Sequence, residues 1–149
     1  MQEATEVHPD DEAIASGFAQ LYEGLRRLTP RDGLSLTAAS VLRRLERSGR
    51  QRLCDLCGPE GVTQPAMTQL VTRLEKDGLA ERGSDPADGR VVIVSITDAG
   101  RAAVERRRAR NAEALSEHLR ALPTEDRAAI LAALPAMERL SGLVAEQPQ

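Results

Sequence analysis

The chain has 149 residues, which fits one small domain or one compact module with additional helices. The chain has one Phe, one Tyr and no Trp, so its core must consist of aliphatic side chains. Proteins that bind single-stranded nucleic acids stack bases on aromatic side chains, and this chain has too few of them for that role. The net charge is −3, so the position of the charged residues decides which partners the chain can have.

The charges are segregated along the chain. Residues 1–12 carry five acidic side chains and no Lys or Arg, and residues 123–149 carry four acidic side chains and two arginines. Residues 13–122 therefore carry a net charge of +4. A basic central segment between acidic ends is compatible with nucleic-acid contact, because the local potential matters more than the total charge.

The sequence predicts a cytoplasmic protein. It has no run of about 18 apolar residues that could form a transmembrane helix. Its first twelve residues are acidic and polar, unlike a signal peptide or an Arg-rich transit peptide. Two cysteines in a chain of this length do not form the disulfide framework of a small secreted protein.

Helical periodicity predicts long helices at both ends of the chain. The first runs from Asp10 to about Leu28 and is followed by a turn over residues 29–33. A long Arg-rich helix is expected from a cap at Asp98 to about Leu122, and Pro123-Thr124 begins the last helix.

The central segment predicts three helices and a hairpin. Thr37 is the expected N-cap of a helix that ends near Gly49, and a short helix around Cys54–Cys57 is expected to stop at Gly58-Pro59. A third helix follows the candidate N-cap Thr63 and extends to Lys76. The period then changes to about two in residues 79–83 and 91–97, which flank a turn-rich segment and predict a β-hairpin.

The helix over residues 63–76 has the clearest two-faced pattern. Met67, Leu70, Val71 and Leu74 repeat at the spacing of one buried face. The opposite face then presents Pro65, Thr68, Gln69, Thr72 and Lys76, with Arg73 on the flank. Gln can pair with adenine and Thr can bond base edges or touch a thymine methyl, while helix N-terminal amides near Thr63 and Gln64 can hold a phosphate. The alternative is an ordinary solvated helix face.

The order of these elements indicates a mainly α fold with a small β-hairpin wing, which is a winged helix-turn-helix. Residues 61–79 (GVTQPAMTQLVTRLEKDGL), 85–90 (DPADGR) and 96–100 (ITDAG) resemble the MarR family of bacterial regulators over essentially the whole chain. The resemblance implies a single domain over residues 1–149. Its dimerisation helices would cover about 10–30 and 98–149, and its winged module about 34–97.

The resemblance also implies the function and its residues. It implies a homodimeric DNA-binding transcriptional regulator, most often a repressor, that inserts residues 63–76 into the major groove and the wing, residues 84–91, into the minor groove. The residues expected to contact DNA are Thr63, Gln64, Pro65, Ala66, Thr68, Gln69, Thr72, Arg73 and Arg90. Asp88 matches an aspartate that braces the wing against a basic residue, here Arg73 or Arg90.

The wing departs from the family pattern at one position. Gly89-Arg90 stands where the family usually has two consecutive arginines, so one DNA contact of the wing is in doubt. Relatives of this type often respond to small phenolic or lipophilic compounds between the winged module and the dimerisation helices. A small-molecule effector is therefore a possible partner, and the sequence identifies neither it nor its pocket.

Cys54 and Cys57 allow two interpretations. A Cys-x-x-Cys pair can be a redox sensor, because a thiol at a helix N-terminus has a lowered pKa. The alternative, which we favour, is a small buried Cys57 beside Leu56 with Cys54 substituting for a cap. Structural zinc needs four ligands, and His8 and His118 are distant in the sequence, so no metal or cofactor is expected.

Arginines outside the central motif are expected to have lesser roles. The cluster in the long Arg-rich helix is expected to form a solvated helix face; its members are Arg106, Arg107, Arg108 and Arg110. One or two of the arginines nearer the motif could touch backbone phosphates; these are Arg43, Arg44, Arg47, Arg50 and Arg52.

Two other classes of function were weighed. A thiol oxidoreductase would need the Cys pair in a strand-turn-helix context, which this sequence lacks. The sequence also has no phosphate-binding loop and no catalytic triad. The chain is therefore not expected to be an enzyme. A winged-helix dimer that binds another protein is disfavoured by the polar, acid-poor face of the helix over residues 63–76.

Overall fold

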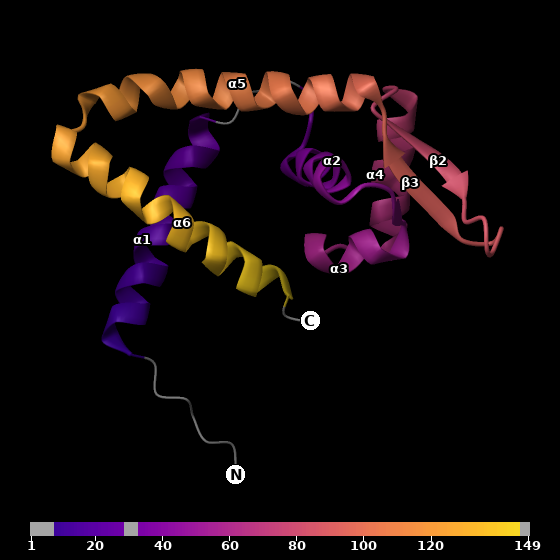
Figure 1. The fold of residues 1–149 in the computed structure, drawn as a ribbon, viewed down its shortest axis with the longest axis horizontal. Coiled ribbons are helices and arrows are strands. Elements are labelled where there is room, and N and C mark those ends of the chain that lie inside the picture. The colour runs from indigo at the N-terminus through magenta and orange to yellow at the C-terminus, as the bar shows by residue number, and fades with distance from the viewer. Residues whose placement is uncertain (1–7, 29–32, 147–149) are drawn as a thin grey trace, which may run out of the picture. The chain divides into compact units, whose positions relative to one another are not determined.

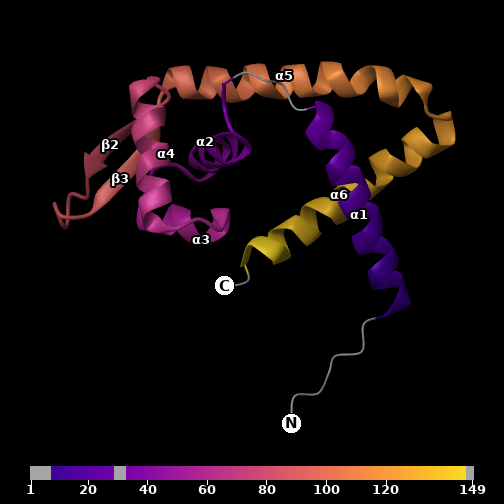
Figure 2. The ribbon, with the colours of Figure 1, turned by 180° about the vertical axis from the view of Figure 1, so that it is seen from behind.

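A computed structural model describes residues 8–28 and 33–146 (Figures 1 and 2). The chain divides into two compact units, Met1–Arg31 and Asp32–Gln149. Residues 29–32, which include most of the turn expected after the first helix, lie outside the described residues, as do the acidic residues Glu3 and Glu6.

The first unit contains helix α1 (Pro9–Leu28). Asp10, Asp11 and Glu12 lie in its first turn and Arg26 and Arg27 in its last, which matches the charges that the helix dipole favours at each end. Ile14, Leu21, Tyr22 and Leu25 are exposed on this helix.

The second unit begins with helix α2 (Leu36–Ser48), and its start differs from the expected one. The N-cap is Ser35, whose side chain accepts a hydrogen bond from the Ala38 N–H at 3.1 Å; the sequence prediction of Thr37 is wrong by two residues. Ser35 is the residue with extended backbone, and a cap needs that conformation as well as a side-chain oxygen.

Short elements join α2 to the next long helix. These are strand β1 (Gln51–Arg52), a 3₁₀ turn over Cys54–Leu56, and helix α3 (Cys57–Glu60), which ends at Gly61 in the left-handed conformation. Gly58-Pro59 lies inside α3 and does not stop it, because a proline in the first helical turn has no N–H bond to lose. Strand β1 was not predicted.

Helix α4 (Gln64–Lys76) matches its prediction, with Thr63 as N-cap and Pro65 in the first turn. Strands β2 (Ala80–Ser84) and β3 (Val92–Ile96) form the expected hairpin, and β1 pairs with the free edge of β3 to give the antiparallel order β1-β3-β2. Figures 1 and 2 show α4 alongside the two long strands and the hairpin loop projecting beyond the helices.

Helices α5 (Asp98–Ala121) and α6 (Thr124–Glu146) complete the chain. The N-cap of α5 is Thr97 and not Asp98; its hydroxyl accepts from the Gly100 N–H at 3.0 Å and donates to the Gly78 carbonyl oxygen at 2.6 Å. Asp98 is instead the first helical residue, where its charge faces the positive end of the helix dipole.

One aliphatic core holds the winged module together. It joins α2, α4, the sheet and the first turns of α5, and its fully buried members include Leu42, Leu45, Leu56, Met67 and Val94. Full burial of one such side chain contributes about 1.5–3 kcal/mol. Helices α2–α4 followed by the hairpin form a winged helix-turn-helix, so the predicted fold is confirmed.

Gly100 allows the first turn of α5 to pack against the chain between α4 and β2. A Cβ atom at this position would overlap the Leu79 carbonyl oxygen and lie 2.7 Å from Ile96 Cγ1. We therefore expect Gly100→Ala to lower the free energy of unfolding by about 1–3 kcal/mol, measured by urea denaturation. Gly83→Ala is the control, because its Cβ would meet open space, and it should not lower the free energy of unfolding. Equal stabilities of the two variants would contradict this packing.

Candidate nucleic-acid interface

The outward face of α4 is one continuous polar surface. Met67, Val71 and Leu74 are buried in the core and Leu70 is almost so. The residues predicted for DNA contact on this helix are all exposed: Thr63, Gln64, Pro65, Ala66, Thr68, Gln69, Thr72 and Arg73. No acidic side chain lies between Thr63 and Arg73, so this surface carries no charge that repels phosphate.

The start of α4 is fixed locally. The Thr63 hydroxyl accepts a hydrogen bond from the Ala66 N–H at 3.5 Å, and Pro65 presets the backbone angle of the first turn. Pro65 has no N–H and the Ala66 N–H is bonded to Thr63, so the Gln64 N–H is the amide of this turn that can approach an anion, such as a backbone phosphate, at the positive end of the helix dipole.

Arg82 joins the hairpin to α4, and the sequence analysis missed it. From strand β2 its guanidinium donates to the Thr68 carbonyl oxygen and to the Thr72 hydroxyl, both at 2.9 Å. It also forms an ion pair with Glu75 at 2.8 Å. Three contacts with successive turns of α4 fix the angle between hairpin and helix. The contacts between Arg82 and α4 depend on tertiary structure, so no local sequence pattern predicts them.

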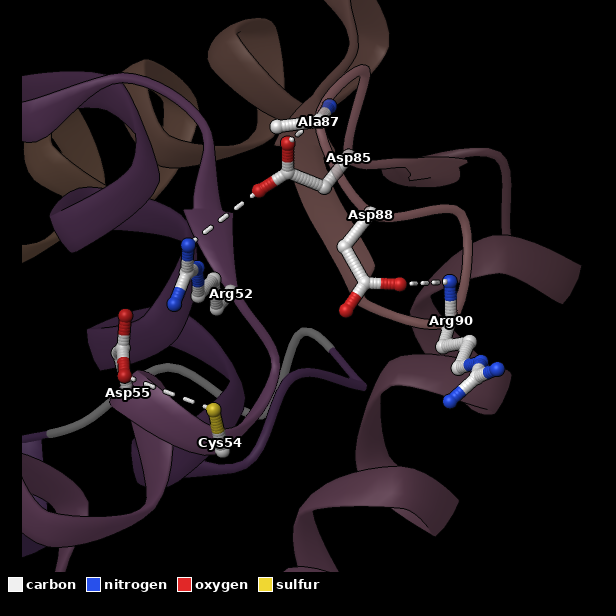
Figure 3. A network of polar contacts seen from close by, with 7 residues as sticks. All are labelled: Arg52, Cys54, Asp55, Asp85, Ala87, Asp88 and Arg90. Atoms are coloured by element: carbon white, nitrogen blue, oxygen red, sulfur yellow. Dashed lines mark hydrogen bonds and ion pairs between the residues drawn. The ribbon is translucent and has the colours of Figure 1, made fainter.

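The wing loop is stabilised by its own aspartates (Figure 3). The Asp85 carboxylate accepts from the Ala87 N–H at 2.9 Å, and the Asp88 carboxylate accepts from the Arg90 N–H at 3.0 Å. Asp88 therefore contacts the backbone of Arg90, whereas the sequence analysis expected it to brace a basic side chain. The Arg90 side chain is exposed at the tip and directed away from the two aspartates.

The ion pair that anchors the wing is Arg52–Asp85. Arg52 comes from strand β1, and its guanidinium lies 3.4 Å from the Asp85 carboxylate, which is only 15% exposed (Figure 3). Arg44 lies 3.8 Å from Glu60 on α3. Two of the five arginines proposed as phosphate contacts therefore have acidic partners within the protein. Arg43, Arg47 and Arg50 are exposed.

The two cysteines are free thiols with unequal surroundings. Cys54 is exposed, lies within the 3₁₀ turn and donates to Asp55 at 3.5 Å; the cap of that turn is Leu53, so the interpretation of Cys54 as a cap is wrong. Cys57 packs against the core and donates to the Leu53 carbonyl oxygen at 3.6 Å. Burial, with a smaller contribution from Cys54, raises the pKa of the Cys57 thiol. This is the opposite of the shift that activates a redox cysteine.

The prediction of a solvated arginine face on α5 is wrong for Arg107. It is 4% exposed and donates to the Leu34 carbonyl oxygen at 3.1 Å, while Arg106, Arg108 and Arg110 are exposed as expected. It follows Ala103 and Val104 by four and three residues, so it lies on the face of α5 that packs against α2. A cavity of about 210 Å³ opens beside it, lined by Leu34, Ala39, Arg43, Val104, Arg107, Arg108 and Asn111.

Within residues 8–28 and 33–146, no group of three or more His, Cys, Asp or Glu side chains could hold a metal ion. None of the helices in these same ranges has both the length and the apolar character needed to cross a membrane.

Comparison with known proteins identifies relatives of the same architecture. The MarR family model matches residues 34–92. A helix-turn-helix transcriptional regulator of Mycobacterium bovis is 32% identical over 114 residues, which are 76% of this chain and 80% of that protein. The transcriptional repressor IacR of Pseudomonas putida is 27% identical over 93 residues, 62% of this chain and 56% of its own. The structure of Bordetella bronchiseptica BpsR, whose DNA binding is regulated by 6-hydroxynicotinic acid, is 25% identical. The match covers 85% of this chain and 98% of the BpsR chain, with a TM-score of 0.61.

The surroundings of Cys57 predict a slow thiol. In a Cys54→Ser variant, alkylation of Cys57 by iodoacetamide should be slower at pH 8 than alkylation of free cysteine. Its pH midpoint should also be higher, because burial disfavours the thiolate and a raised pKa moves deprotonation to higher pH. The same variant unfolded in guanidinium should regain the rate of a free thiol. A midpoint below that of free cysteine would instead identify an activated, sensor-type thiol.

Proposed function

The chain belongs to the MarR family of DNA-binding transcriptional regulators, and from this premise we propose that it is a homodimeric repressor of a pseudo-palindromic operator. The observation that carries the proposal is the exposed face of α4, which has no acidic side chain from Thr63 to Arg73, beside a projecting hairpin. A helix of this kind fits the major groove of double-stranded DNA, which is wide enough to admit it.

In this proposal α4 and the wing contact different parts of the operator. Gln69 reads a base edge near the centre of the exposed face, and Thr63, Gln64, Pro65 and Ala66 approach the backbone or bases at the helix start. Thr68, Thr72 and Arg73 complete the contact surface. Arg90 enters the adjacent minor groove from the wing tip, where narrow A·T segments attract arginine. Asp88 supports Arg90 by fixing its backbone N–H.

The homodimer is proposed from apolar surface. Exposed large apolar residues line α1 and α6: Ile14, Leu21, Tyr22 and Leu25 on the first helix, and Ile130, Leu131, Leu134, Leu140, Leu143 and Val144 on the last. Large apolar side chains at this density along a helix favour burial against a partner. A second copy, with residues of about 10–30 and 98–149 as dimerisation helices, would cover it and leave the winged module of about 34–97 free. Residues 1–149 would then act as one domain.

Repression in the cytoplasm is the simplest outcome of such binding. A dimer seated on an operator blocks access to the DNA beneath it, and the relative IacR is named a repressor.

A small organic anion is proposed as effector. The cavity between α2 and α5 combines apolar walls, Leu34, Ala39 and Val104, with the arginines Arg43 and Arg108. Apolar walls with a few charged groups suit a flat aromatic carboxylate. The relative BpsR is regulated by a molecule of that class.

Substitutions should separate the roles of α4 and the wing. Gln69→Ala should relax base preference at particular operator positions, at a cost of about 1–3 kcal/mol per half-site for a lost bidentate contact. Arg90→Ala should weaken binding to most sequences and lower the log–log salt slope by about one unit per lost phosphate-type contact. Titrations against matched and mutated operators at several salt concentrations measure both. The assignment of base readout to α4 and of groove contact to the wing would be wrong if Arg90→Ala bound DNA like the parent while Gln69→Ala lost the same affinity for every sequence.

The effector site predicts a charge-dependent response. 6-Hydroxynicotinic acid should raise the melting temperature and weaken operator binding, whereas its uncharged amide should do neither, because only the acid can pair with Arg43 and compete with Glu105 for Arg108. Arg43→Gln should reduce the effect of the acid. Equal changes in melting temperature and operator binding with the acid and the amide would contradict the proposal. So would the absence of any change with a panel of small aromatic carboxylates that includes 6-hydroxynicotinic acid.

A further inference from the structure

The hydroxyl groups on the exposed face of α4 are already engaged within the protein. The Thr68 hydroxyl donates its hydrogen to the Gln64 carbonyl oxygen at 2.9 Å, and the Thr72 hydroxyl donates to the Thr68 carbonyl oxygen at 2.8 Å. A hydroxyl has one hydrogen to donate. In this arrangement neither threonine donates to an acceptor on a base.

Thr72 is more fully engaged than Thr68. Its hydroxyl oxygen also accepts a charged hydrogen bond from Arg82 at 2.9 Å, so its hydrogen and one of its two lone pairs are both used. The same guanidinium donates to the Thr68 carbonyl oxygen. The hydroxyl of Thr72 is thereby held against the helix backbone and toward the hairpin, so this exposed side chain offers a ligand its methyl group and one lone pair of the oxygen, but no hydrogen to donate.

Glu75 holds Arg82 in this position. Its carboxylate lies 2.8 Å from the guanidinium, and both side chains are about one-third exposed or less. The pair neutralises the charge of Arg82, whose N–H groups are directed at α4. Arg82 is therefore poorly placed to contact a phosphate, in contrast to the exposed Arg90.

We propose that Arg82 is a positioning residue that locks the Thr72 hydroxyl against α4, so that Thr72 reads the C5-methyl group of a thymine through its own methyl group. The inference rests on the proposed binding of α4 in the major groove, where the thymine methyl is exposed. It assigns hydrogen-bond readout at the centre of the face to Gln69 and apolar readout to Thr72.

The test replaces each thymine of a selected operator in turn by deoxyuridine, which removes only the methyl group. At one position per half-site, affinity of the parent protein should fall about fourfold, the effect of one buried methyl group. Thr72→Ser keeps the hydroxyl and loses the methyl, so it should bind the thymine and uracil operators equally. Thr72→Val has a methyl group at both γ positions, so it presents one to the base without the Arg82 hydrogen bond and should retain the preference. Retention of the preference by Thr72→Ser would show that another side chain contacts the thymine methyl and would overturn the proposal, as would loss of the preference in Thr72→Val.

Arg82→Met tests the positioning role. Combined with Glu75→Gln, which removes the carboxylate that would otherwise lose its partner, it should reduce the thymine-over-uracil preference at the Thr72 position while leaving the salt slope unchanged, since Arg82 contacts no phosphate. Arg90→Ala is the matched control and should lower the salt slope without changing that preference. If Arg82→Met lowers the melting temperature and weakens both operators equally, its role is structural only and the inference is wrong.

Failure of this inference is distinguishable from failure of the proposed function. An operator that is selected and bound specifically, yet indifferent to uracil at every position, would overturn the thymine readout alone. Selection of no operator from random DNA would overturn the proposed function and this inference together.

Discussion

The burial of one face of α4 is the constraint on which the rest of the molecule depends. Met67, Leu70, Val71 and Leu74 are spaced so that all four enter the core at once, which fixes the rotation of the helix about its axis. The opposite face must then stay outside, and every residue on it is short, polar or basic between Thr63 and Arg73. The interface is thus a consequence of packing, since no separate element has to hold these side chains in solvent.

Two basic residues from outside α4 set the positions of the parts around this helix. Arg82 ties β2 to the backbone and side chains of α4, and Arg52 ties β1 to Asp85 at the base of the wing loop. The tip beyond Asp85 is held by backbone hydrogen bonds to Asp85 and Asp88, and Arg90 extends from it. The recognition surface therefore combines a helix fixed by the core with a loop fixed by backbone hydrogen bonds to its aspartates and by the Arg52–Asp85 ion pair.

Sequence patterns predicted the elements with strong periodicity and missed those that depend on distant contacts. The two-faced pattern of α4 and the change of period at Leu79 were sufficient for the helix and the hairpin. The caps of α2 and α5 were misplaced because two neighbouring side chains could each serve, and only the backbone conformation decides between them. Strand β1 is two residues long, too short to show alternation. Arg82 and Arg52 act on partners 7 to 33 residues away. Arg107 could have been found, because it is in phase with Ala103 and Val104.

The central claim is that two copies of the α4 surface read DNA together. Selection of bound sequences from a random pool of double-stranded DNA tests it most directly. The account predicts enrichment of one inverted repeat whose half-site centres lie about 10 bp apart, since two recognition helices related by a twofold axis must enter successive major grooves on one face of the duplex. No enriched sequence, or a single half-site without a symmetric partner, would contradict it.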